Sequence, residues 1–130
     1  MALTHVTAIR NSLADLVVDA IDVGTADANG DLQIGTAAFA AILATIEFQA
    51  PAFGAAVGGT ATMNGAPLED SSAAGGGTAA VFRPRDRDDA EVFQGTVGGT
   101  GSGEDMELSS TTINPGDAVR INSFTYTASP

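Results

Sequence analysis

The sequence contains no cysteine, no tryptophan and no lysine, and it has one histidine, His5. Without cysteine, the chain can form no disulfide, no thiolate metal site and no cysteine nucleophile. One imidazole cannot build a histidine-rich metal site, and no serine or aspartate stands at a recognisable motif spacing from His5. The sequence therefore predicts a protein that is not an enzyme and that binds no cofactor or metal.

Positive charge is also scarce. Sixteen acidic residues face five arginines, which gives a formal net charge of −11. An acidic surface repels phosphate backbones and anionic lipids, so we expect neither nucleic acid nor a membrane as a partner. No apolar run approaches the ~18 residues of a membrane span, and the first residues lack the pattern of a signal peptide. We expect a protein that is made and used in soluble form.

Large apolar side chains are few, because the chain has only six Phe and one Tyr beside 16 Gly. Folding must overcome the extra backbone freedom that glycine has in the unfolded chain. A length of 130 residues is that of one domain. We therefore expect a single domain with a thin core, which gains part of its stability from contacts with partners.

The stretch Thr4–Ile21 has the spacing of an amphipathic helix, and Gly24 stands where a left-handed C-terminal cap belongs. We assign residues 1–24 to an N-terminal helix and residues 25–130 to a β domain, within a single domain overall. Two interpretations of the apolar face are open: it packs on the protein's own sheet, which is the simpler reading, or it docks on a neighbouring subunit. The residues on this face are Ile9, Leu13, Leu16, Val17, Ala20 and Ile21.

The rest of the chain is organised around the stretch Thr78–Val97, in which two runs of Val, Phe and Thr flank the charged tip Arg85–Asp89. This pattern predicts a β-hairpin with a solvated turn. Short strands and Gly-rich connections elsewhere predict a mainly β fold, a small β-sandwich or jelly-roll-like barrel of about six to eight strands with one N-terminal α-helix. The hairpin should be central, and the expected core residues are Phe82, Phe93, Val97, Leu108, Val119 and Ile121.

Two long strands are expected near the end of the chain, separated by the turn Asn114–Asp117. They are Met106–Ile113 and Ala118–Thr127. In the second, Val119 and Ile121 point to one side whereas the aromatic residues that follow point to the other. This switch indicates a bulge, or burial on both sides of the strand.

The stretch DANGD at residues 27–31 has oxygen-bearing side chains at alternate positions, as a calcium-binding loop does. These are Asp27, Asn29 and Asp31. An EF-hand loop then requires glycine at its sixth position and glutamate at its twelfth, where this chain has Leu32 and Ala38. An Asn-Gly turn that leads into a strand explains the same residues more simply.

Arginine is concentrated at the hairpin tip, beside the three aspartates Asp86, Asp88 and Asp89. Such a turn compensates its own charge, and we expect it to be solvated. Arginine is also favoured at interfaces, because its planar head pairs with carboxylates and its stem covers apolar surface. The alternative hypothesis is therefore that at least one of three side chains reaches an acidic patch on a neighbouring subunit. These are Arg83, Arg85 and Arg87.

The order of motifs after residue 40 is similar to that of small alanine- and glycine-rich virion proteins of tailed bacteriophages. The matching steps are a Pro-Ala-Phe-Gly turn, a Phe-rich hairpin, a Leu-Ser-Ser strand and a final Ser-Phe-Thr-Tyr-Thr strand, at Pro51–Gly54, Val81–Val97, Leu108–Ser110 and Ser123–Thr127. The resemblance implies a capsid decoration, or cement, protein that clamps adjacent capsid subunits on the capsid exterior. It implies no catalytic or cofactor-binding residue.

The expected partners of such a protein are the major capsid protein and copies of itself, as a homo-oligomer on the capsid. Before assembly it would be soluble in the host cytoplasm. Two alternatives remain open. One is a calcium- or glycan-binding β-module of a tail or surface fibre, and the other is a neck or tail component of the virion.

Overall fold

The computed structural model describes residues 3–129. Strands make up 35% of the chain and helices 15%, which confirms a mainly β fold with one N-terminal helix. The helical elements are α1 (Thr7–Asp19) and two 3-10 turns, Ala20–Asp22 and Ala37–Phe39. The strands are β1 (Asp31–Gly35), β2 (Ile42–Glu47), β3 (Thr60–Thr62), β4 (Leu68–Asp70), β5 (Gly77–Thr78), β6 (Val81–Arg85), β7 (Gly95–Gly99), β8 (Met106–Leu108), β9 (Thr112–Ile113), β10 (Val119–Ile121) and β11 (Thr125–Thr127).

The largest sheet has five strands in the order β2-β1-β6-β7-β8, so β6 lies at its centre. β6 and β7 pair antiparallel, with Phe82 opposite Gly95, and the loop between them spans residues 86–94. The predicted hairpin and its central place are confirmed. Arg85 belongs to strand β6 rather than to the tip, because it pairs with Asp31 of β1 across the sheet.

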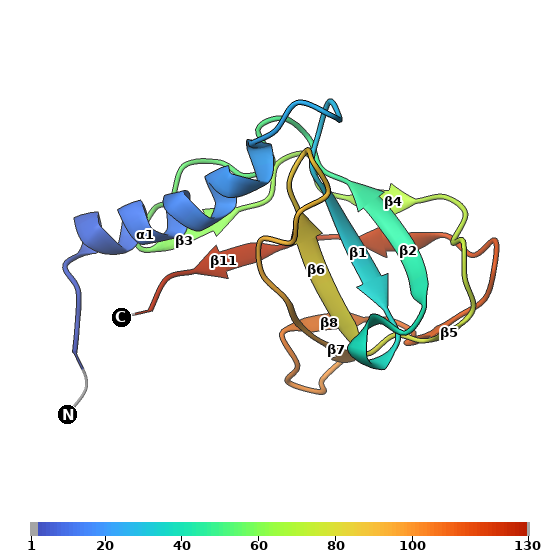
Figure 1. Ribbon diagram of the computed structural model, residues 1–130. Coiled ribbons are helices and arrows are strands. Elements are labelled where there is room, and N and C mark those ends of the chain that lie inside the picture. The colour runs from blue at the N-terminus through green and yellow to red at the C-terminus, as the bar shows by residue number, and fades with distance from the viewer. Residues whose placement is uncertain (1–2, 130) are drawn as a thin grey trace.

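The remaining strands form three two-stranded sheets, β10-β4, β11-β3 and β5-β9. Figure 1 shows that the five-stranded sheet is curled, with β4 beyond β2 at one side and β8 at the other. We call this curled sheet, together with β4 and β10, the half-barrel. The finer prediction of a sandwich or jelly-roll-like barrel is not confirmed, and the parallel pairing of β7 with β8 is a feature that the sequence pattern did not indicate.

Each of the two long strands predicted near the end of the chain is divided in two. The stretch Ala118–Thr127 forms β10, which pairs with β4, and then β11, which pairs with β3. Between them, residues 122–124 are irregular. The change of side after Ile121 is therefore a break between two strands instead of a bulge, because the chain leaves one small sheet and enters another.

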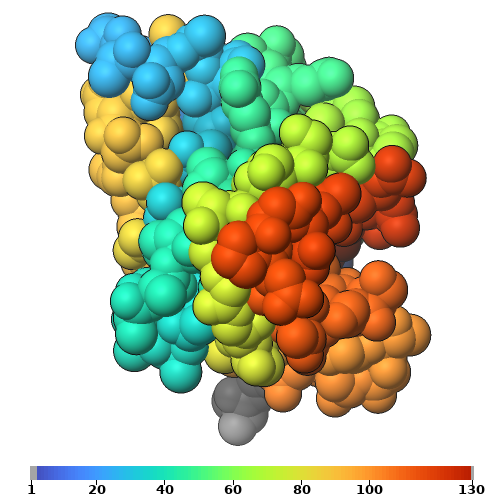
Figure 2. All heavy atoms as spheres, turned by 90° about the vertical axis from the view of Figure 1, so that its right-hand side faces the viewer, coloured from blue at the N-terminus to red at the C-terminus, as the bar shows by residue number. Residues whose placement is uncertain are grey.

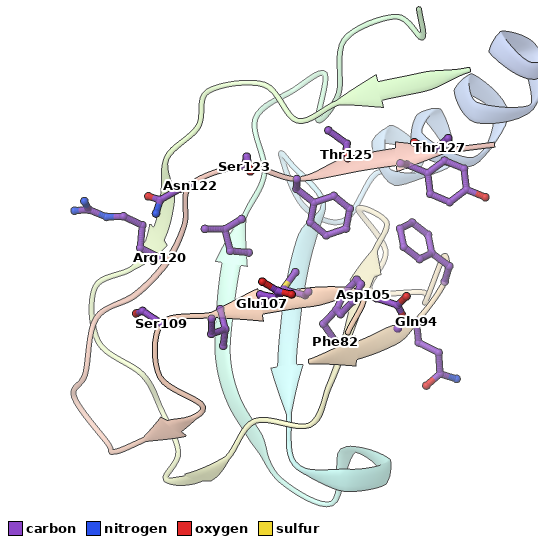
Figure 3. Close-up of a pocket in the computed structure, with 17 residues that line it drawn as sticks. Phe82, Gln94, Asp105, Glu107, Ser109, Arg120, Asn122, Ser123, Thr125 and Thr127 are labelled. Atoms are coloured by element: carbon purple, nitrogen blue, oxygen red, sulfur yellow. The ribbon is translucent and has the colours of Figure 1, made fainter. Parts of the chain in front are cut away.

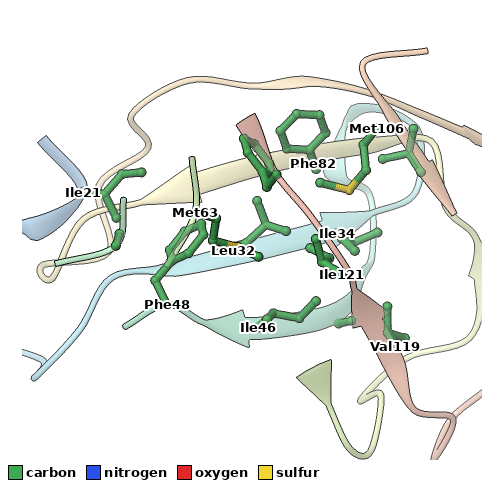
Figure 4. Close-up of a cluster of buried hydrophobic side chains, with 14 of the residues drawn as sticks. Ile21, Leu32, Ile34, Ile46, Phe48, Met63, Phe82, Met106, Val119 and Ile121 are labelled. Carbon is green, nitrogen blue, oxygen red and sulfur yellow. The ribbon is translucent and has the colours of Figure 1, made fainter. Parts of the chain in front are cut away.

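The core contains the inward side chains of the half-barrel and the end of the N-terminal helical segment (Figure 4). Five of the six predicted core residues are buried, and the sixth, Phe93, is partly buried against Phe82 and Phe124. The fully buried Ile21 joins the helical segment to this core. The largest fully buried side chains are Phe48, Ile21, Leu32, Ile34, Leu43, Ile46, Val18 and Pro84.

Three elements extend away from the half-barrel. Figure 1 shows α1 lying beside β3 and β11, to the left of the five-stranded sheet. We call these three elements the arm. The predicted helix Thr4–Ile21 is confirmed over Thr7–Asp19 and continues into the 3-10 turn Ala20–Asp22.

Candidate functional sites

The inward side of α1 is polar. Two side chains of α1 and one of the following 3-10 turn accept hydrogen bonds from backbone N–H groups of the irregular segment that leads into β3. The contacts are Gly59 N–H to Asn11 Oδ1 (2.7 Å), Ala56 N–H to Asp15 Oδ1 (2.8 Å) and Ala52 N–H to Asp22 Oδ1 (2.9 Å). Because a segment without a partner strand leaves its N–H groups unpaired, these polar side chains supply the missing acceptors. The small residue Ala14 and Val18 fill the buried space between them.

The opposite side of the N-terminal segment is apolar and exposed. We call its five most exposed side chains the apolar stripe: Leu3 (83% exposed), Val6 (69%), Ile9 (48%), Leu13 (37%) and Leu16 (72%). The simpler sequence interpretation, that the apolar face packs on the protein's own sheet, is wrong for the last three of these. Of the predicted face, Ile21 is buried, and Val17 and Ala20 are half-buried.

Negative charge gathers at the C-terminal end of α1, away from most of the stripe. Partial burial, and then repulsion by Asp15 and Asp22, raises the pKa of Asp19 above its ordinary value. No acidic residue occurs among the first fourteen of the sequence. The stripe is therefore an apolar, almost charge-free surface on a strongly acidic protein.

Two of the three predicted arginines are engaged within the subunit. The Arg85 guanidinium binds both carboxylate oxygens of Asp31 (2.8 and 2.7 Å) and also contacts Asp89 at 3.1 Å. The hydrogen bond to Asp31, ahead of smaller electrostatic contributions, raises the pKa of Arg85. Arg83 donates two hydrogen bonds to the Gln33 side-chain oxygen (3.0 and 2.9 Å) and lies 4.3 Å above the centre of the Phe39 ring.

The three tip aspartates mostly bind backbone rather than arginine, so the self-compensating turn is confirmed only for the pair Arg85–Asp89. Asp86 accepts the N–H groups of Asp88 and Ala90 within the turn. Asp88 accepts the N–H groups of Thr25 and Ala26 at 2.9 Å each, and these two bonds lower its pKa. The hairpin loop is thereby fastened to the connection between α1 and β1.

The calcium-loop alternative is not supported by the positions of its side chains. Both carboxylate oxygens of Asp31 are occupied by Arg85, and the Asn29 amide donates to Glu47. Within residues 3–129, no three His, Cys, Asp or Glu side chains converge in an arrangement that could hold a metal ion. The simpler interpretation, a turn that leads into β1, agrees with the observed strand.

A cleft of about 590 Å³ lies between β8 and the segment Arg120–Thr127. Figure 3 shows the two chain segments with the lining side chains between and around them. In the view of Figure 2, the orange residues near position 105 lie next to the red residues near position 120. The sequence did not indicate this site, because its lining comes from Phe82, residues 93–95, residues 105–109 and residues 120–127.

β8, which forms one wall of the cleft, follows a loop that folds around a carboxylate. β7 and β8 are parallel neighbours, although only residues 100–105 connect them. Glu107 accepts the N–H groups of Gly101 and Gly103 at 3.0 Å each, and these bonds lower its pKa. Both glycines have positive φ (82° and 80°), which a residue with a Cβ adopts rarely. Glu107 therefore stabilises the short connection between β7 and β8.

Neither a protein-family model, nor a curated protein, nor a solved structure matches this chain, so the functional argument depends on its own residues. No helix within the described range has the length and apolar character that a bilayer crossing requires. The predicted apolar face contains three residues of the stripe and lacks the other two, Leu3 and Val6. Their spacing from Ile9 continues the same pattern and could have revealed them.

Proposed function

We propose that this protein is a structural protein of a tailed-bacteriophage virion, a capsid decoration protein that clamps adjacent capsid subunits. The resemblance of its motifs to small virion proteins motivates the proposal, and the exposed apolar stripe on the N-terminal segment is the observation that carries it. Exposed apolar patches of this kind mark surfaces that contact other proteins. The partners are the major capsid protein and further copies of this chain on the capsid exterior.

The size of the stripe favours binding within an assembly. Five partly exposed aliphatic side chains offer an apolar patch of about a few hundred Å², whereas a stable protein interface needs about 800 Å² from each partner. The stripe is thus large enough to form the centre of an interface but too small to form all of it. A clamp that touches several subunits of a shell supplies the remaining area from other surfaces.

The distribution of charge suits the same role. A formal charge of −11 keeps free copies soluble and apart, while the stripe gives them a surface on which that repulsion is weak. The half-barrel then stands outward from the docked arm.

Among the three arginines, Arg87 is the one that can add a polar contact to a neighbour. Its Nε donates to the carbonyl oxygen of Asp27 at 2.7 Å, and its terminal nitrogens form no hydrogen bond within the described residues. Arg83 and Arg85 are already engaged inside the subunit. We therefore narrow the arginine hypothesis to Arg87.

A shell-binding assay tests the proposal. The double substitution Ile9→Ser and Leu16→Ser should weaken binding to undecorated capsids by about a hundredfold, since each buried aliphatic side chain contributes about 1.5 kcal/mol or more. The isolated variant should keep its melting temperature, because both side chains are exposed. The matched control is Val23→Ser with Val57→Ser, which changes two side chains that are 61% and 79% exposed outside the stripe.

The abundance of the protein in purified virions separates the shell from other locations. A copy number comparable to that of the capsid subunits agrees with decoration. A handful of copies per particle would place the protein in the neck or tail. Absence from purified virions, or unchanged capsid binding by the folded stripe variant, would overturn the proposal.

A further inference from the structure

The cleft beside β8 is bounded by strand edges that have no partner strand in the described part of the chain, and we call this unpaired region the seam. β8 has a neighbour on one side only, and so do β10 and β11, whose partners are β4 and β3 among the described strands. The cleft is lined by all three strands. Its volume of about 590 Å³ lies within the range of about 300–1,000 Å³ that is usual for small-ligand sites.

The floor of the cleft is apolar, and aromatic rings line one of its ends. Phe93 and Tyr126 lie with their ring centres 5.3 Å apart, and Phe93 also contacts Phe82 and Phe124. Tyr126 is only half-buried, so part of its ring faces the solvent. The floor is completed by Met106, Leu108 and Ile121.

The rim of the cleft is polar, and three of its side chains are free to form hydrogen bonds with a ligand. The side chains of Gln94, Asn122 and Ser123 are exposed and form no hydrogen bond within the described residues. Each amide can both donate and accept, and the hydroxyl of Ser123 can do the same. Adjacent hydroxyl groups of a ligand are recognised by groups with this dual capacity.

Charge at the cleft excludes anionic ligands. Asp105 binds the N–H and hydroxyl of Thr96 through one oxygen, which leaves the other oxygen unbound. The guanidinium of Arg120 is paired with Glu69 at 3.2 Å. The lining therefore offers unpaired carboxylate oxygen but no unpaired cation, and a ligand with its own carboxylate or phosphate would be repelled.

We propose that this cleft is a carbohydrate-binding site for a neutral glycan. A sugar ring has an apolar C–H face and polar edges, which match the half-exposed Tyr126 ring and the amides of Gln94 and Asn122. An extended peptide, the other ligand that open strand edges attract, fits less well. β8, β10 and β11 have three residues each, and the irregular residues 122–124 interrupt any continuous ladder.

The test is a titration of the full chain with four neutral hexasaccharides, namely cellohexaose, maltohexaose, chitohexaose and mannohexaose, followed by NMR. At least one should shift the resonances of Asn122 and Tyr126 with a Kd below about 1 mM, while a galacturonic acid oligomer of the same length should not bind. The double variant Gln94→Ala with Asn122→Ala should weaken binding at least about tenfold, since each lost hydrogen bond costs about 0.5–1.5 kcal/mol.

Asn114→Ala is the matched control, because Asn114 is exposed, its side chain forms no hydrogen bond within the described residues and it lies outside the cleft. This variant should bind like the unchanged protein. Failure of all four neutral sugars to bind would overturn the proposal, and so would equal binding by the cleft variant and the control. If an alternating Thr-Val heptapeptide shifts the cleft resonances and no sugar does, the seam is a strand-pairing site instead. The outcome is independent of the capsid-binding assay, because no residue of the apolar stripe lines the cleft.

Discussion

The arm and the half-barrel are stabilised by different means. The half-barrel buries large side chains under a five-stranded sheet. Aromatic rings pack there one against the next, in the order Phe93, Phe82, Phe124 and Phe53. The arm buries small residues, fastens its helix with carboxylate and amide groups, and leaves its largest aliphatic side chains in solvent. In this molecule, the backbone beneath α1 needs hydrogen-bond acceptors, so the helix turns Asn11 and Asp15 inward beside Ala14 and Val18 and leaves its larger aliphatic side chains outside.

The largest effect is expected from opening a cavity in the half-barrel. Phe82 is 3% exposed and packs edge-on against Phe93 and Phe124. Phe82→Ala should lower the free energy of unfolding by about 3–5 kcal/mol, because the lost ring leaves space that its neighbours fill only in part. Chemical denaturation measures this change. A loss below about 1 kcal/mol would show that the half-barrel is not the main source of stability.

An intermediate effect is expected from removing the polar contacts of the arm. Asp15→Ala deletes the acceptor of the Ala56 N–H and should cost about 1 kcal/mol, partly offset because it also relieves repulsion of Asp19. Hydrogen exchange should become faster at Ala56 and remain unchanged at Ile34 in β1. Equal acceleration at both amides would mean that the two regions open together and that the contrast between them is wrong.

The smallest effect on stability is expected when the pH is lowered. Asp88 and Glu107 have folded-state pKa values below their ordinary 3.8 and 4.5, so their ionised forms stabilise the fold above those values. This stability is lost as the pH falls through the lowered folded-state pKa. Asp19 acts in the opposite sense, since partial burial, and then repulsion by Asp15 and Asp22, raises its pKa, so that its protonation favours the fold. The melting temperature should therefore fall below about pH 4, and the fall should be smaller in a variant with Asp88→Asn and Glu107→Gln.

Local chemistry predicted much of the half-barrel. Alternation of Val and Phe indicated the central hairpin, and the Pro-Gly pair indicated the turn at Gly116, whose φ is 90°. The division of the last strand was not predictable, because β10 and β11 differ in their partners rather than in their composition. Helix periodicity located α1 correctly but turned Ile9, Leu13 and Leu16 to the wrong side, since the acceptors needed by residues 52–59 are a property of the fold.

The candidate sites show the same limit. The arginines were located by sequence, but Arg83 finds its partner Gln33 fifty positions away in the chain, and no spacing rule connects them. The cleft combines residues from positions 82 to 127, so it exists only after the strands have paired. The stripe was the most accessible to prediction, because its residues are close in sequence. Only the side of the helix that faces the rest of the protein had to be learned from the structure.

The course of the chain through the arm also has a mechanical consequence. β3 and β11 run antiparallel and side by side along the arm, and β11 continues β10 after a short irregular segment (Figure 1). Hydrogen bonds between antiparallel strands lie perpendicular to the strands. A tensile load applied along the arm would therefore pull these bonds in shear, so that all of them resist together instead of opening one by one. An arm anchored at one end would transmit force to the half-barrel without peeling from it.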